Sequence, residues 1–173
     1  KDSPIKTISD LKGKRVALNK GSNVNYLIVR ALEANGLKYS DIVPAYLAPA
    51  DARAAFERGS VDAWVIWDPY YAAAELSLGA RLIADGTGLA PNVAFYIASR
   101  PVAERNPEVL KVVLSAIDEI DVWIAANRKQ FAAELSPKIG LPADVIERSV
   151  NRSNLGAAPI DAATLEGQQK IAD

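Results

Sequence analysis

Apolar residues occur in two patterns in the first hundred positions. Some form short continuous runs, and others recur at helical spacing. A run at 16–19 leads through Gly21 into the segment 22–34, where apolar residues recur every three or four positions. That repeat places the apolar side chains on one face of a helix. Asn35 and Gly36 follow, and Gly36 tolerates the positive φ that commonly ends a helix. The pattern therefore predicts a strand at 16–19 and a helix at 22–34.

The same alternation continues to residue 98. Further strands are predicted at 42–47, 63–67, 81–84 and 95–98, and further helices at 50–58 and after Asp68-Pro69. Pro44 lacks a backbone donor, which predicts either an edge position for its strand or a later start of that strand. Asp68 is expected to be the N-cap of its helix, with Pro69 at the first helical position. Alternating strands and helices predict an α/β fold with a mainly parallel sheet.

Only helical spacing is found after Ser99. Pro107 begins a long helix that is predicted to reach about Ala126, with an apolar stripe along one side. That stripe consists of Val109, Leu110, Val113, Ile117, Ile120 and Ile124. Shorter helices are predicted at 129–135, 142–151 and 161–171. These helices need a surface to pack on, and residues 1–99 contain too little uncovered sheet to supply it.

The amino-acid composition limits the kinds of chemistry that the protein could perform. The chain has no His and no Cys, and its 20 Lys and Arg against 21 Asp and Glu give a formal net charge of −1. The commonest metal ligands, the commonest general base and any thiol nucleophile are therefore missing. Basic residues are spread along the chain, which argues against nucleic acid as a partner. We expect no metal, no cofactor and no catalytic residue.

The start of the first predicted helix is a candidate anion site. Gly21 provides the turn, and backbone N–H groups at a helix start are unpaired and carry partial positive charge. Ser22 and Asn23 add polar side chains at the same point, ahead of Val24. An alternative interpretation is that Ser22 is an ordinary N-cap in a strand-to-helix connection.

Several segments, in this order and spacing, resemble the aliphatic sulfonate-binding proteins of bacterial ABC importers, which are relatives of the taurine- and nitrate-binding proteins. The segments are LKGKRVA at 11–17, KGSNV at 20–24, YSDI at 39–42, DARAAF at 51–56 and DAWVIWDPY at 62–70. Weaker matches are NPEV at 106–109 and QQKIAD at 168–173. The resemblance implies a two-lobed periplasmic solute receptor of the periplasmic-binding-protein-like (type II) fold. Its partners would be a small organosulfonate or other oxoanion and a membrane permease.

The resemblance also implies a set of ligand-binding residues. They are Gly21, Ser22, Asn23, Val24, Trp67, Asp68 and Asn92. Backbone N–H groups of the first four would hold a sulfonate oxygen, and Trp67 would cover an alkyl chain. Apart from the resemblance, Trp67 is better interpreted as a core aromatic. A helix cap suits Asp68 better than ligand contact, because a carboxylate repels a sulfonate. Asn25 stands where family members often have His, and 91–94 is poorer in polar residues than in the family, so the preferred solute is expected to differ.

The family's lobe organisation implies three parts in this chain. Residues 1–94 would form one complete α/β lobe, and residues 95–98 would be the strand that crosses back. Residues 99–173 would be the C-terminal helices of the other lobe. The N-terminal part of that other lobe would be absent, which would explain the uncovered helices.

Other functions fit less well. Phosphate-loop and dinucleotide motifs fail on glycine spacing. Asp62, Asp68 and Asp85 could converge for acid–base chemistry, but each lies at an element boundary where caps and turns are common. Two alternatives share the fold: the effector lobe of a LysR-type regulator, and a pyrimidine-precursor synthase whose chemistry needs the histidines that are missing here.

Overall fold

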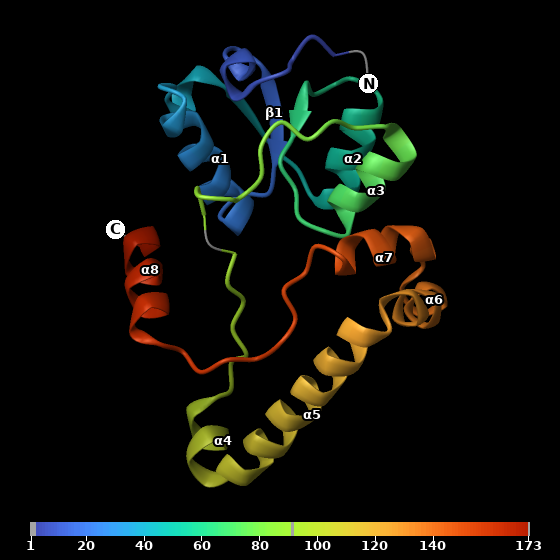
Figure 1. Ribbon diagram of the computed structural model, residues 1–173. Helices are drawn as coiled ribbons and strands as arrows, with labels where there is room; N and C mark the ends of the chain where they lie inside the picture. The colour runs from blue at the N-terminus through green and yellow to red at the C-terminus, as the bar shows by residue number, and fades with distance from the viewer. Residues whose placement is uncertain (1–2, 91, 173) are drawn as a thin grey trace. The chain divides into compact units, whose positions relative to one another are not determined.

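The computed structural model describes residues 3–90 and 92–172, and it divides into two compact units at residues 92 and 93 (Figure 1). Four residues lie outside the described part of the chain: Lys1, Asp2, Pro91 and Asp173. They belong to segments that were used in the resemblance or in the predicted lobe boundaries. Each unit is described below by itself.

The first unit is built on a three-stranded parallel sheet. Its strands are β1 (Arg15–Leu18), β2 (Val43–Tyr46) and β3 (Ala63–Trp64), in the order β2-β1-β3. Val16 is paired with Pro44 on one side and with Ala63 on the other. Pro44 therefore lies on an edge strand, as predicted, where its missing N–H leaves no gap between strands.

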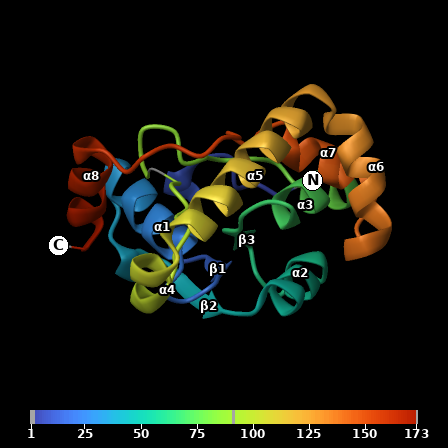
Figure 2. The same cartoon turned by 90° about the horizontal axis from the view of Figure 1, so that it is seen from below.

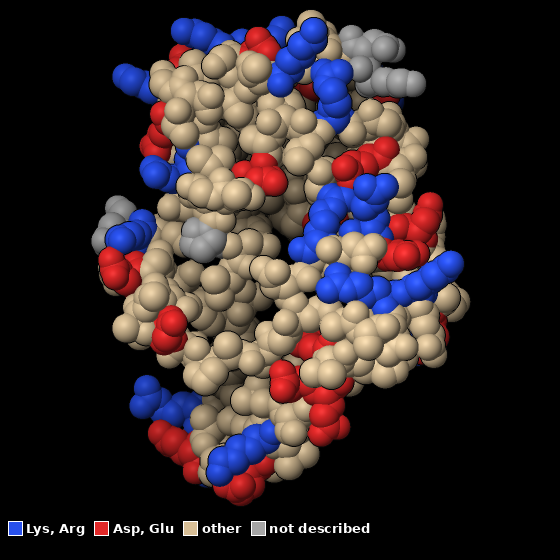
Figure 3. Space-filling view, in the orientation of Figure 1, with Lys and Arg blue, Asp and Glu red and all other residues tan. Residues whose placement is uncertain are grey.

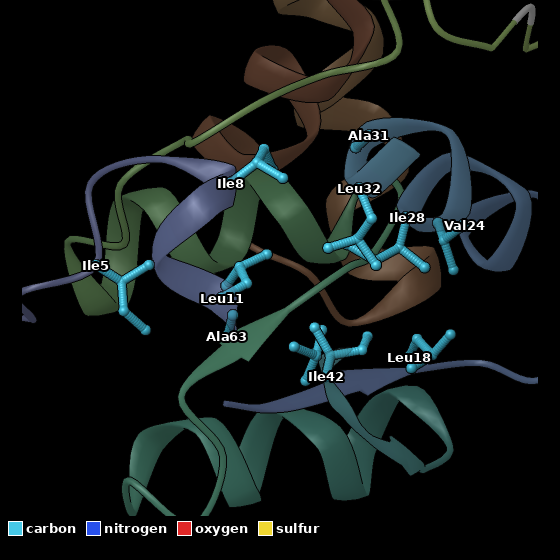
Figure 4. Close-up of a cluster of buried hydrophobic side chains, with 11 residues drawn as sticks. Ile5, Ile8, Leu11, Leu18, Val24, Ile28, Ala31, Leu32, Ile42 and Ala63 are labelled. Carbon is cyan, nitrogen blue, oxygen red and sulfur yellow. The ribbon is translucent and has the colours of Figure 1, made fainter. Parts of the chain in front are cut away.

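Helices cover both faces of this sheet (Figure 1). They are the short 3-10 helices η1 (Ile8–Leu11) and η2 (Tyr39–Asp41) and the α-helices α1 (Asn23–Ala34), α2 (Pro49–Glu57) and α3 (Tyr70–Leu78). The alternation of side chains along β1 separates two cores. Val16 and Leu18 pack with α1 and η1, whereas Ala17 packs with α2. Figure 4 shows the larger cluster, in which α1 side chains lie over those of β1 and Ile42.

Helices are the regular secondary structure among the described residues of the second unit, and non-helical segments connect them. It contains α4 (Arg100–Arg105), α5 (Pro107–Ala126), α6 (Arg128–Ile139), α7 (Ala143–Val150) and α8 (Ala162–Ala172), seen from below in Figure 2. Its small core joins α5, α6 and α7 through Ile124, Ala132 and Ile146. The long helix predicted from Pro107 to about Ala126 is confirmed as α5, whereas α4 was not anticipated.

Two predicted strands are wrong. Residues 81–84 and 95–98 carry no strand, and β3 is shorter than the predicted 63–67. An apolar run becomes a strand only where a neighbouring strand accepts its hydrogen bonds. Neither segment has such a neighbour among the described residues, and Ile97 is 91% exposed. Figure 1 shows both segments as extended coil.

Among residues 3–90 and 92–172, no helix combines the length and the apolar character that crossing a membrane requires. On the face drawn in Figure 3, basic and acidic side chains are interspersed, in keeping with the nearly balanced charge of the sequence.

Candidate functional site

The candidate site is the turn that joins β1 to α1. Gly21 has φ +68°, a backbone conformation that residues with a Cβ rarely adopt. No other atom lies within 4 Å of the position where a Cβ would be. Ser22 is extended, with φ −99° and ψ 173°, and it takes the N-cap position of α1. The chain thus leaves the carboxyl end of a parallel strand and directly begins a twelve-residue helix. Ligands commonly bind at this end of parallel strands in α/β folds.

Of the four consecutive backbone N–H groups at this turn, the first and the last have an acceptor. Gly21 donates to Asn25 Oδ1 at 3.2 Å, and Val24 donates to Asn23 Oδ1 at 3.0 Å. Between them, the N–H groups of Ser22 and Asn23 have no acceptor within the described part of the chain. Two adjacent donors at the positive end of a helix are therefore available to an anion.

The side chain of Ser22 does not cap α1. Its hydroxyl donates to the carbonyl oxygen of Asn19 at 2.8 Å, and no side-chain cap bond is made at the N-cap. The ordinary N-cap interpretation is therefore correct for the backbone of Ser22 and wrong for its hydroxyl. Val24 is buried in the core beneath the turn, so only its backbone faces the site.

Asn92 lies beside the start of α1. Asn23 Nδ2 donates to Asn92 Oδ1 at 2.9 Å, although the two residues are far apart in sequence. Both residues are exposed, and Asn23 Oδ1 also accepts the N–H of Val24. This contact brings together two of the residues implied by the family resemblance.

Trp67 and Asp68 follow the end of β3. Trp67 is half-buried against the apolar cluster that also contains Val24, so it contributes to the core and keeps part of the indole accessible. Asp68 Oδ1 accepts the N–H of Ala72 at 3.0 Å, which is a capping bond. The helix starts at Tyr70 and Pro69 is its N-cap, one residue later than predicted. Asp68 therefore caps the helix from just outside its N-cap.

A tyrosine pair adjoins the turn and was not anticipated. Tyr39 and Tyr46 share a hydrogen bond of 2.9 Å between their hydroxyl oxygens, and Lys20 Nζ lies 5.4 Å from the centre of the Tyr46 ring. Burial, together with the hydrogen bond to Tyr46, raises the pKa of Tyr39 to about 12, against a smaller opposing effect from its hydrogen bond with Asn25. No residue spacing marks such a pair, because Tyr39 and Tyr46 meet only through the turn between η2 and β2.

The acidic side chains considered for catalysis accept hydrogen bonds from backbone N–H groups. Asp62 Oδ2 accepts the N–H of Arg15 at 2.8 Å. Asp85 Oδ1 accepts the N–H of Thr87 at 2.9 Å, and this hydrogen bonding lowers the pKa of Asp85. Within residues 3–90 and 92–172, no cluster of three or more Asp or Glu is arranged to hold a metal ion.

Comparison with known proteins places the chain in a family. Residues 1–127 match the family described as NMT1/THI5 like. A putative aliphatic sulfonates-binding protein of Escherichia coli is 48% identical over 99% of the chain, which covers 54% of that protein. The taurine-binding periplasmic protein of the same organism is 34% identical over 69% of the chain, which covers 39% of that protein. The chain thus spans about half the length of the curated relatives that match nearly all of it.

Solved structures of similar proteins were also found. The periplasmic aliphatic sulphonate binding protein SsuA from Escherichia coli superposes with a TM-score of 0.92, at 47% identity over 99% of this chain and 56% of its own. SsuA from Xanthomonas axonopodis pv. citri, bound to MOPS, gives 0.89 at 40% identity over 98% of this chain and 59% of its own. A desulfurization enzyme that is 16% identical, at a TM-score of 0.64, shares the fold alone. The fold is that of a periplasmic binding protein, and the chain belongs to the NMT1/THI5-like family.

Proposed function

We propose that the protein is the periplasmic solute-binding component of an ABC importer. It binds an aliphatic sulfonate, or a related small oxoanion, and delivers it to the membrane permease. The observation that carries this proposal is the pair of unpaired N–H groups of Ser22 and Asn23 at the start of α1. The sulfonate- and taurine-binding names of the relatives support it.

The chemistry of the turn suits a sulfonate. Each hydrogen bond from a backbone N–H to a charged oxygen contributes about 1.5–3 kcal/mol, and the partial charge of the helix end adds about 0.3–1 kcal/mol. The accessible part of Trp67 offers an apolar surface for an alkyl chain. Asn23 and Asn92 add exposed amide donors to the same rim.

No turnover of the solute is proposed. The chain has neither His nor Cys, and Asp62, Asp68 and Asp85 already hold backbone N–H groups. For Asp85, the hydrogen bonds from Thr87 lower the pKa, which makes this carboxylate a weaker general base.

We also propose the lobe organisation that the family resemblance implies, with residues 1–94 as one lobe, 95–98 as the crossing segment and 99–173 as part of the other lobe. Apolar side chains exposed at Tyr96 and Ile97 and along α5 support it, because such surfaces are covered in a complete fold.

The first experiment titrates the protein with ethanesulfonate while amide resonances are followed by NMR. Saturable shifts are expected at Ser22 and Asn23. The uncharged ethyl methyl sulfone, which keeps the shape and removes the charge, is expected to cause none.

Ser22→Pro removes one of the two donors and is expected to weaken binding by about tenfold. The matched control is Ala50→Pro, which removes an N–H from the exposed first turn of α2, away from the site. Absence of saturable shifts at the α1 start, or equal weakening by both proline variants, would contradict the proposed function.

A further inference from the structure

The end of α1 contains the pair Asn35-Gly36, the one place in the sequence where Gly follows Asn. Asparagine side chains lose their amide group most readily before glycine, because glycine has no Cβ to obstruct attack by its own backbone nitrogen. Asn35 is the C-cap of α1, and both residues are exposed. Solvent therefore reaches this peptide, and its reactivity depends on the local backbone.

The backbone at the end of α1 binds the nitrogen that would attack. Gly36 has φ 71°, and its N–H donates to the carbonyl oxygen of Glu33 at 3.0 Å. The N–H of Leu37 donates to the carbonyl oxygen of Leu32 at 2.9 Å, and the Leu37 side chain packs against the larger core cluster. These two bonds constitute a Schellman motif, here called the α1 cap and formed by residues 32–37. While the α1 cap is closed, the Gly36 N–H is held in a hydrogen bond.

The closed α1 cap also separates the two groups that would react. Attack on Asn35 Cγ closes a succinimide ring, so the Gly36 nitrogen and Asn35 Cβ must lie on the same side of the Cα–C bond of Asn35. The ψ of Asn35 is 17°, which places them on nearly opposite sides of that bond. The leaving group is held as well, since Asn35 Nδ2 donates to the carbonyl oxygen of Ala31 at 2.8 Å. Reaction therefore requires the α1 cap to open.

We propose that Asn35 is a deamidation site that the α1 cap keeps unreactive and that local opening of the cap exposes. In the open chain, the Gly36 nitrogen forms a bond to Asn35 Cγ and the bond between Cγ and Nδ2 breaks. Nδ2 leaves as ammonia, which carries away the proton of the Gly36 N–H. Water then opens the succinimide ring to aspartate or isoaspartate, with no change in oxidation state.

Deamidation makes the opening of the α1 cap permanent. Aspartate at position 35 places a negative charge at the negative end of α1, and its carboxylate cannot donate to Ala31. Isoaspartate adds a methylene group to the backbone, which changes the spacing of the two cap bonds. The rate of deamidation therefore records how often the end of α1 opens.

The first test compares the folded protein with the urea-unfolded chain. Both are incubated in mildly alkaline buffer, and aspartate and isoaspartate at position 35 are quantified by peptide mapping with mass spectrometry. Deamidation of Asn35 is expected to be slower in the folded protein by about tenfold or more. A synthetic peptide with the sequence of residues 31–40, incubated with and without urea, controls for any effect of urea on the chemistry. Equal rates in the folded and unfolded protein would overturn the inference.

The second test opens the α1 cap by mutation. Leu37→Ala is expected to accelerate deamidation of Asn35 in the folded protein by about threefold or more, because it removes the side chain that anchors the cap to the core. The matched control is Val61→Ala, which truncates a buried side chain in the separate cluster that contains Ala52 and Ala55 of α2. Equal acceleration by both variants, at similar thermal midpoints, would show that global unfolding controls the reaction and would overturn the role of the cap.

The third test examines the product. Asn35→Asp is expected to have a lower thermal midpoint than Asn35→Ala, because both remove the donor to Ala31 and only the aspartate adds a charge at the end of α1. An equal or higher midpoint for Asn35→Asp would contradict the permanent loss of the α1 cap.

Discussion

At the scale of single residues, Tyr39 gives the clearest dependence on pH. Its pKa of about 12, against an ordinary value of 10.0, means that the folded protein favours the neutral phenol, chiefly through burial. A raised pKa contributes stability that is fully present below the unfolded value and is lost as pH rises through the folded one. The stabilisation from Tyr39 is therefore lost between about pH 10 and pH 12.

An ultraviolet titration of tyrosinate tests this. One of the six tyrosines is expected to ionise well after the others, and Tyr46→Phe is expected to lower its pKa by removing the shared hydrogen bond. Tyr96→Phe is the control, because Tyr96 is 64% exposed. Simultaneous ionisation of all six would show that Tyr39 lies in ordinary solvent.

Residue spacing predicts the backbone of the site better than its side chains. Gly21 before a polar helix start was enough to predict the turn and the unpaired donors, because both follow from backbone geometry. The bond between Asn23 and Asn92, and the orientation of Asn25, depend on which rotamers the folded surroundings allow. The sequence alone does not specify those rotamers, so both contacts were visible only in the structure.

At the scale of elements, the helical repeat predicted helices correctly, whereas short apolar runs did not reliably predict strands. α1 and α5 were predicted closely because a repeat over twelve or twenty residues fixes the buried face. A short, mostly apolar run, such as 81–84 or 95–98, forms a strand only if a partner strand lies alongside. Whether a partner strand is present depends on the rest of the sheet, so it cannot be predicted from the apolar run alone.

Burial of the α1 face predicts a large effect of truncation in the first unit. Leu32 has no exposed surface and lies in the cluster between α1 and the sheet. Leu32→Ala is expected to lower the free energy of unfolding by about 2–5 kcal/mol through lost contacts and a residual cavity. Leu165→Ala on α8, where the side chain is 60% exposed, is expected to cost no more than about 0.5 kcal/mol. Urea unfolding followed by tryptophan fluorescence measures both, and similar losses would contradict the described core.

At the scale of the whole molecule, one side of α5 is left uncovered. Val109, Val113 and Ile120 lie on the predicted apolar stripe and are all about half exposed or more in the structure. Leaving such side chains in water forgoes about 1.5–3 kcal/mol each relative to full burial. We propose that this face packs against a further part of the fold, since the relatives that match nearly the whole chain are about twice its length.

The uncovered face predicts binding of an environment-sensitive apolar dye. The 173-residue chain is expected to increase the fluorescence of such a dye, and joint replacement of Val109, Val113 and Ile120 by Gln is expected to abolish most of the increase. The thermal midpoint should stay nearly constant, because exposed side chains contribute little to the core and Gln suits a helix. Leu165→Gln, which alters one exposed leucine on α8, controls for the loss of scattered apolar surface. A large fall in the thermal midpoint of the triple variant would mean that the stripe is already buried in the protein, and the proposed packing surface would then be wrong.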